Sequence, residues 1–147
     1  MSEQSKVKDA IACFNGGFNC AQAIVATYCE QFGMDKETAL KVSCGLGGGM
    51  GKLQETCGAV TGAYLVLGLK HGQYLKDDSA AKEKTYKLVR EFDKLFKDKN
   101  KTTNCRELLG ADLMGSEKIP MEQVKRRCSR IVREAAEILE NVLQHAD

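Results

Sequence analysis

The stretch TCGAVTGAYLVLGLKH, residues 56–71, decides the fold of this chain. It is apolar on nearly every side. Gly58, Ala59, Gly62 and Ala63 form one face of small residues, on which a neighbouring helix can pack closely. A helix that is apolar all round has to be buried among other elements. We therefore expect residues 56–71 to form the buried central helix of an all-α protein.

The rest of the chain also has the pattern of helices. Apolar residues recur at helical spacing, there is one proline, and no repeat or linker divides the sequence. We expect a single domain over residues 1–147, built as a helical bundle of about seven helices, with a solvated loop at 98–101. The expected helices run roughly over Glu3–Phe14, Cys20–Phe32, Asp35–Cys44, Thr56–His71, Ser79–Lys97, Thr103–Gly110 and Pro120–Gln144.

Composition and charge exclude several classes of protein. The 147 residues carry a net charge of +2 with acids and bases mixed, unlike the basic footprint of a nucleic-acid binder. The N-terminus lacks the pattern of a signal peptide. The most apolar stretch, residues 59–69, is too short to span a bilayer. We expect a cytoplasmic protein that binds no nucleic acid and has no membrane span.

Seven cysteines stand out in this ordinary composition. An odd number cannot pair off completely within one chain, and in a reducing compartment clustered cysteines indicate a metal, a cluster or a reactive thiol. No CxxC or CxxCH motif occurs, and there are two histidines. These facts disfavour a thioredoxin motif, a zinc ribbon, covalently bound haem and a Cys₂His₂ zinc site.

Three of the cysteines are placed where helices are expected to begin. Each follows a residue that is a good N-cap: Cys20 follows Asn19, Cys57 follows Thr56, and Cys105 follows Asn104. The unpaired N–H groups and positive dipole of a helix N-terminus stabilise a thiolate. We therefore expect the pKa of all three thiols to be lowered.

The other four cysteines are placed differently. Cys128 lies mid-helix on an apolar stripe, where it would face inward and where desolvation should raise its pKa. Alone it would be read as a small core residue, but it could meet the helix starts inside the bundle. Cys13 and Cys29 follow the apolar pattern and are expected to pack in the core. Cys44 ends a helix and is a second-rank candidate.

A glycine-rich loop, GLGGGMGK, covers residues 45–52. Its spacing fits neither the P-loop nor the dinucleotide fingerprint, so nucleotide binding is not favoured. Glycine instead allows a sharp turn or a close backbone approach. We expect Gly48, Gly49 and Gly51 to bring backbone N–H groups close to the cysteine sulfurs or a group bound there.

The order of these motifs resembles a known family. A CGAxxG motif at Cys57–Gly62 follows the glycine-rich loop and the segment GFNCAQA, which ends at Ala23, and it precedes lone cysteines at 105 and 128. This order resembles the C-GCAxxG-C-C family of redox-active proteins, over most of the chain. The resemblance implies an all-helical fold, a redox role and four characteristic cysteines. Related domains occur in certain haem cytochromes that hold an iron centre, but this chain lacks their haem motifs.

The leading hypothesis is that Cys20, Cys57, Cys105 and Cys128 gather into one site and ligate an iron–sulfur cluster or another metal centre. Such a centre would serve electron transfer or sensing. A second hypothesis is a thiol–disulfide oxidoreductase without metal. A third is a non-catalytic helical interaction protein, with zinc or nothing at the cysteines. The partner would be an electron-transfer or thiol protein, and the pattern is compatible with a homodimer.

Overall fold

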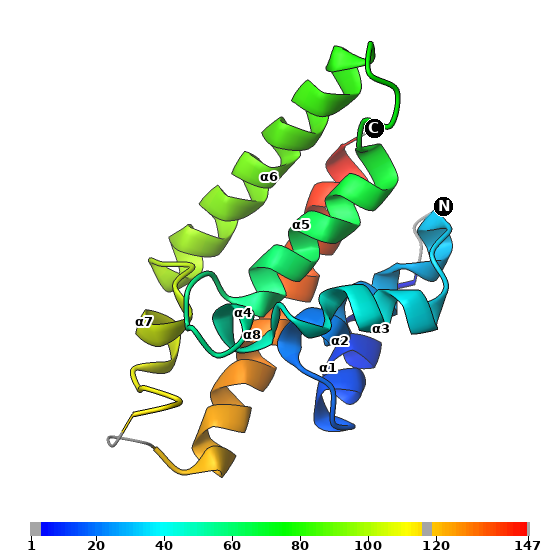
Figure 1. The fold of residues 1–147 in the computed structure, drawn as a ribbon. Coiled ribbons are helices and arrows are strands. Elements are labelled where there is room, and N and C mark those ends of the chain that lie inside the picture. Colours follow the sequence, from blue (N-terminus) through cyan, green and yellow to red (C-terminus); the bar gives the residue numbers. More distant parts are fainter. Residues whose placement is uncertain (1–3, 116–118, 147) are drawn as a thin grey trace.

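The computed structural model describes residues 4–115 and 119–146 (Figure 1). Over these residues the chain forms helices and no β-strand, which confirms the all-α prediction. The expected start of the first helix, Glu3, lies outside the described residues. The elements are α1 (Val7–Asn15), α2 (Cys20–Tyr28), a 3-10 turn η1 (Glu30–Phe32), α3 (Lys36–Cys44), α4 (Gly47–Met50), α5 (Gly58–His71), α6 (Ser79–Asn100), α7 (Cys105–Leu109) and α8 (Met121–His145).

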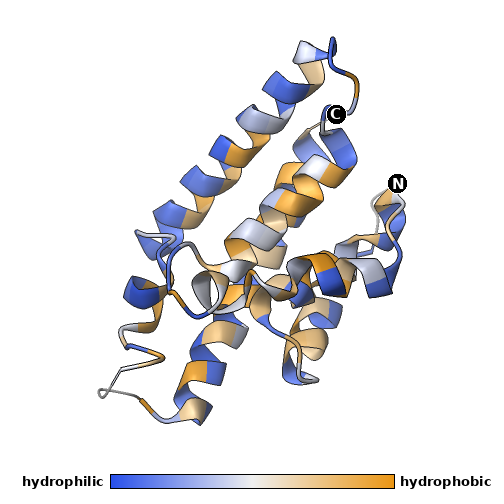
Figure 2. Ribbon diagram, in the orientation of Figure 1, coloured by the Kyte–Doolittle hydropathy of each residue, from blue (hydrophilic) through white to orange (hydrophobic). Residues whose placement is uncertain are grey.

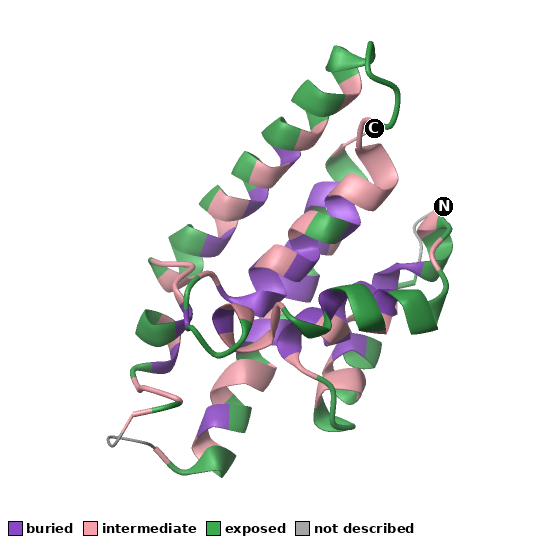
Figure 3. Ribbon diagram, in the orientation of Figure 1, coloured by how far each residue is buried: buried purple, intermediate pink, exposed green. Residues whose placement is uncertain are grey.

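Helix α5 is the centre of the bundle, as its sequence predicts. It packs against α2, α6 and α8, and in Figure 1 it runs antiparallel to α6 and in the same direction as α8. Figure 3 shows that many residues of α5 are buried. The small residues Gly62 and Ala63 are buried, and a Cβ on Gly62 would lie 3.1 Å from the Ala21 carbonyl oxygen. The small face therefore lets α2 and α5 approach closely.

Helix α6 covers the outside of this core and is amphipathic. Its outward face is hydrophilic in Figure 2, while Leu88, Phe92 and Phe96 point inward and are buried. The helix continues to Asn100, so the prediction of a loop over 98–101 is wrong for three residues. A Lys94–Asp98 ion pair at 3.5 Å spans this last turn. Lys101, whose φ is 69°, caps the C-terminus of the helix. Local helical pairing offsets the polar composition that suggested a loop.

The short element α4 is a left-handed turn and not an ordinary helix. Gly48, Gly49, Met50, Gly51 and Lys52 all have φ between 62° and 69°. For residues with a Cβ this conformation costs roughly 1–2 kcal/mol each, whereas glycine adopts it freely. The glycine-rich loop therefore makes the sharp turn that its sequence predicts. The other seven α-helices of the described residues correspond to the seven expected ones.

Within the described residues, no helix combines the length and the apolar character that crossing a membrane requires.

Candidate functional site

Four elements bring their cysteines to one cavity. Cys20 begins α2, Cys57 immediately precedes α5, Cys105 begins α7, and Cys128 lies in the first half of α8. All four line a cavity of about 40 Å³. The first three are buried and Cys128 is half-buried. The remaining wall is apolar and consists of Gly48, Leu108, Leu109, Leu113 and Ile131.

A short backbone contact sets two of these cysteines beside each other. Thr56 and Asn104 form an isolated antiparallel bridge between the segments that precede α5 and α7. On either side of it, the N–H groups of Cys57 and Cys105 donate to carbonyl oxygens of the opposite segment, at 2.8 Å and 2.6 Å. The starts of α5 and α7 are therefore fixed relative to each other by main-chain hydrogen bonds.

The predicted N-caps are confirmed for two of the three helix-start cysteines. Asn19 caps α2 in a capping box with Gln22, and the Asn104 side chain accepts the Glu107 N–H at the start of α7. The prediction that Thr56 caps α5 is wrong, because Thr56 is held in the bridge. Helix α5 begins at Gly58, and Cys57 itself occupies the cap position without a side-chain cap bond.

Glycines allow the close packing around the sulfurs. A Cβ on Gly58 would lie 2.7 Å from Cys20 Sγ, and a Cβ on Gly49 would lie 2.7 Å from Cys105 Cβ. Gly48 lines the cavity, and its N–H bonds to the Cys20 sulfur. Gly51 is exposed, and a Cβ there would meet nothing within 4 Å. Gly48, Gly49 and Gly58 therefore allow a close contact or a backbone hydrogen bond at the cavity, whereas Gly51 serves only the turn.

Cys20 has the acidic thiol of the group. A hydrogen bond from the Cys57 thiol lowers the pKa of Cys20 to about 7, against the opposing effect of burial. Backbone N–H groups of Gly48, Ala21 and Ala59 lower this pKa further. The prediction of a lowered pKa is therefore right for Cys20, and the helix start supplies part of the reason.

For Cys57 and Cys105 the same prediction is wrong. The hydrogen bond that the Cys57 thiol donates to Cys20 raises the pKa of Cys57 well above the ordinary value, and burial raises it further. Burial raises the pKa of Cys105 to about 11, and a Cys20 thiolate adds to the effect. Burial also raises the pKa of Cys128 to about 12, in the predicted direction. Four thiols around one small apolar cavity cannot all ionise without a counter-charge.

The remaining cysteines lie away from this cavity. Cys29 is buried beside Val25 and Ala39, where its thiol donates to the Ala26 carbonyl oxygen at 3.4 Å. Cys13 is half-buried and packs against the main core. Both therefore occupy the packing positions that the sequence predicts. Cys44 is exposed at the end of α3.

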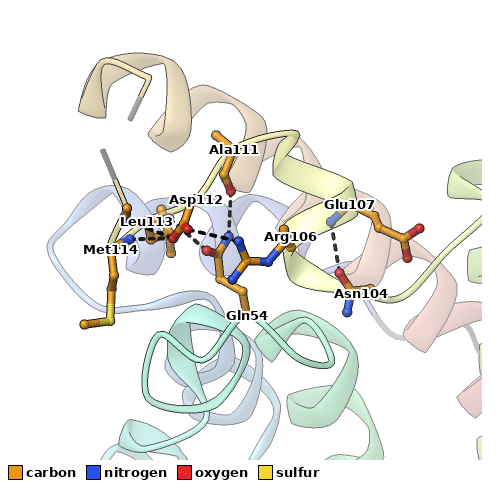
Figure 4. Close-up of polar contacts among 9 residues, drawn as sticks. Gln54, Asn104, Arg106, Glu107, Ala111, Asp112, Leu113 and Met114 are labelled. Carbon is orange, nitrogen blue, oxygen red and sulfur yellow. Dashed lines mark hydrogen bonds and ion pairs between the residues drawn. The ribbon is translucent and has the colours of Figure 1, made fainter. Parts of the chain in front are cut away.

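Gln54 belongs to the site although no sequence pattern predicts it. Its side chain is 2 % exposed, its Nε2 donates to the Ala111 carbonyl oxygen, and its Oε1 accepts the Leu113 N–H, both at 2.8 Å. The same side chain hydrogen-bonds Cys105. Figure 4 shows it between the glycine-rich turn and the segment after α7. A single glutamine behind a glycine-rich loop carries no sequence signal for this role.

The donor set determines which bound groups the cavity fits. The side chains that line it supply sulfur and no oxygen or nitrogen, which favours soft metals and iron–sulfur clusters. Over residues 4–115 and 119–146, no three Cys, His, Asp or Glu side chains are arranged to hold one metal ion. A cluster spreads its ligands over more than one iron, so binding one requires the hydrogen-bonded sulfurs of Cys20 and Cys57 to move apart.

The comparison with known families agrees with this set of cysteines. Residues 18–142 match the family described as "Putative redox-active protein (C_GCAxxG_C_C)". The chain belongs to this family. The C_GCAxxG_C_C match includes all four cysteines of the cavity, and the central motif has the order Cys57-Gly58-Ala59 followed by Gly62. No curated protein and no solved structure matches the chain.

Proposed function

We propose that this protein is an electron-transfer or redox-sensing protein in which Cys20, Cys57, Cys105 and Cys128 hold an iron–sulfur cluster. The observation that carries the proposal is the meeting of these four thiols, from four separate elements, around one apolar cavity. When bound, the cluster supplies a centre that gains and loses electrons. Membership of a family described as redox-active supports the same class of function.

The raised pKa values of the metal-free thiols are consistent with this proposal. Burial or a neighbouring thiol raises the pKa of three of the four thiols, so these three hold their protons in metal-free protein near neutral pH. Metal binding replaces those protons and supplies the missing positive charge. Cluster uptake should therefore release protons and stabilise the fold.

The backbone around the cavity suits the same role. The N–H groups of Gly48, Ala21 and Ala59 point at the Cys20 sulfur. Hydrogen bonds to ligand sulfurs tune the reduction potential of a cluster. The apolar side chains of Leu109, Leu113 and Ile131 line the cavity and keep water from a bound group.

Anaerobic reconstitution with ferrous iron and sulfide tests the proposal. We expect stoichiometric iron and acid-labile sulfide, a visible charge-transfer absorption that bleaches on reduction, and an electron paramagnetic resonance signal. Replacing Cys20, Cys57, Cys105 or Cys128 by serine should reduce the iron content strongly. Cluster uptake unchanged in these four variants, or absent from folded wild-type protein, would show that the cavity does not bind a cluster.

Cys13 and Cys29 supply the matched controls. They pack in the core away from the cavity, so Cys13→Ala and Cys29→Ala should retain the wild-type iron content. Each should lose on the order of 1 kcal/mol of unfolding free energy, as small buried truncations do. Loss of iron in a folded control variant would place the boundary of the site elsewhere.

A thiol–disulfide function is the second candidate, and one contact favours it. The Cys57 thiol donates a hydrogen bond to the Cys20 sulfur. The pKa of Cys20 is about 7, so Cys20 is partly thiolate near neutral pH. A thiolate with a pKa near ambient pH is the best attacking thiol. The pair therefore has one acidic thiol and one protonated partner in direct contact.

The second function would proceed by thiol–disulfide exchange in two steps. The Cys20 thiolate attacks a partner disulfide, forms a mixed disulfide and releases one partner thiolate, which takes up a proton. The Cys57 thiol then gives up its proton and attacks the Cys20 sulfur. The Cys20–Cys57 disulfide forms and the second partner thiolate leaves, so two electrons pass to the partner.

The two functions make different demands on the cysteines. The thiol–disulfide reaction requires Cys20 and Cys57 alone, whereas a cluster requires Cys105 and Cys128 as well. If the second candidate is correct, metal-free wild-type protein should reduce a small aromatic disulfide, and Cys105→Ser and Cys128→Ser should retain this activity. Its absence from metal-free wild-type protein would eliminate that candidate.

A further inference from the structure

We infer that Gln54 is a positioning residue of the cysteine site: its amide holds the segment 111–113 over the cavity and donates a hydrogen bond to the Cys105 sulfur. The effect on a bound cluster rests on the proposed function. The hold of Gln54 on residues 111–113, which we call the latch, does not rest on that function, since it can be measured in metal-free protein.

The hydrogen bonds of Gln54 account for its whole amide group. Oε1 accepts the Leu113 N–H, which fixes the orientation of the amide, because nitrogen could not accept that bond. One hydrogen of Nε2 goes to the Ala111 carbonyl oxygen. The other is then the hydrogen available to the Cys105 sulfur, with which the side chain forms a hydrogen bond.

The backbone of Gln54 is strained, which shows that its position is imposed by the surrounding contacts. Its φ is 56°, and its N–H donates to the Gly48 carbonyl oxygen at 3.0 Å. A left-handed conformation costs a residue with a Cβ roughly 1–2 kcal/mol, and glycine would avoid this cost. A glutamine in this place indicates that its side-chain bonds offset the strain.

The segment that Gln54 holds forms one wall of the cavity. Leu113 lines the cavity, and the Gln54 amide grips the main chain on both sides of Asp112. Asp112 organises the segment independently: it accepts the N–H groups of Met114 and Gly115 and pairs with Arg106 at 3.1 Å (Figure 4). Gln54 therefore anchors an already formed turn to the sulfur site.

Two substitutions separate the two roles of the amide. Gln54→Met has a similar length and removes the acceptor for Leu113 and the donors to Ala111 and Cys105. Gln54→Glu keeps the acceptor for Leu113, loses the donors to Ala111 and to Cys105, and adds a negative charge beside the sulfur. Gln73→Met is the matched control, because Gln73 also donates Nε2 to backbone carbonyl oxygens but lies beyond the far end of α5.

The first measurement uses metal-free protein. Amide hydrogen exchange at Leu113 should speed up several-fold in Gln54→Met and by less in Gln54→Glu, which keeps the acceptor for Leu113 but loses the bond to the Ala111 carbonyl oxygen. Unchanged exchange at Leu113 in a folded Gln54→Met protein would overturn the latch, whether or not the protein binds a cluster.

The second measurement uses the reconstituted protein. A donor to a ligand sulfur stabilises the more negative, reduced cluster, so losing it lowers the midpoint potential. We expect a more negative potential in Gln54→Met and a larger negative shift in Gln54→Glu, with Gln73→Met unchanged. If the wild type carries a cluster and Gln54→Glu keeps the wild-type potential, Gln54 makes no bond to the sulfur. If the wild type takes up no cluster, the proposed function fails and the exchange experiment alone decides the latch.

Discussion

The thiol of Cys57 donates a hydrogen bond to the sulfur of Cys20, and this contact makes two neighbouring helix-start cysteines chemically unequal. The bond lowers the pKa of Cys20 to about 7 and raises the pKa of Cys57 well above its ordinary value. In metal-free protein Cys20 therefore loses its proton before Cys57 does. Any ligand that binds both thiolates has to displace the proton between them.

Removing the donor tests this account of Cys20. In Cys57→Ala the sulfur of Cys20 loses its strongest partner while burial remains, so the pKa of Cys20 should rise above about 7. The measurement is the pH midpoint of iodoacetamide labelling at Cys20, followed by mass spectrometry of metal-free native protein. Cys29→Ala, in a separate part of the core, should leave the midpoint unchanged. A wild-type midpoint for Cys20 in Cys57→Ala would mean that the N–H groups alone set its pKa.

The buried thiol of Cys128 makes the stability of metal-free protein depend on pH. Its pKa is raised from 9.0 to about 12, so between these values the unfolded chain has lost the proton that the folded protein keeps. Stability should therefore be complete below about pH 9 and fall as the pH rises, by at most about 1.4 kcal/mol per pH unit. Urea unfolding at about pH 8 and about pH 10 should show a smaller loss for Cys128→Ala than for the wild type. Equal losses would show that Cys128 is not desolvated in the folded state.

Two glycines of α5 separate sulfur packing from helix propensity. A Cβ on Gly58 would lie 2.7 Å from Cys20 Sγ and 2.8 Å from the Leu46 carbonyl oxygen, whereas a Cβ on Gly68 would meet nothing within 4 Å. Gly58→Ala should cost about 1–3 kcal/mol of unfolding free energy and reduce the iron content after reconstitution. Gly68→Ala should be neutral or gain up to about 1 kcal/mol, since alanine favours helix. Urea unfolding and iron analysis of both variants decide the point, and equal behaviour would contradict the close approach at Gly58.

The fold was predictable because its signals are local. Asn19 and Asn104 start helices by accepting N–H groups three residues on, and Gly33, with φ of 92°, stops the helical run that contains Cys20. The apolar residues of α5 require a buried place whatever surrounds them. The four cysteines could also be selected from the sequence, three by their place at expected helix starts and Cys128 by the motif order of the family, since its apolar stripe alone predicts a core residue.

The chemistry of the site was less predictable because it depends on contacts between distant segments. In the sequence, Cys20, Cys57 and Cys105 are equivalent, since each is expected at the start of a helix. Their pKa values diverge because Cys57 meets Cys20 directly and because burial dominates at Cys105. Gln54 lies 57 residues before Ala111 and 51 before Cys105, so its contacts leave no periodic or local pattern.

The left-handed turn gives the last prediction, since two adjacent residues in it should respond oppositely to substitution. Lys52 has φ of 65° and bears the roughly 1–2 kcal/mol cost of that conformation, so Lys52→Gly should stabilise the protein by about 0.5–1 kcal/mol after the entropy cost of glycine. Gly51 has φ of 62° with open space around it, so Gly51→Ala should destabilise by about 1 kcal/mol through the backbone alone. Urea unfolding of metal-free protein measures both changes. Gly51 and Lys52 are exposed, so the substitutions change packing little. If Lys52→Gly destabilises the protein, residues 48–52 do not form a left-handed turn in solution, and the N–H group that Gly48 directs at Cys20 loses its structural basis.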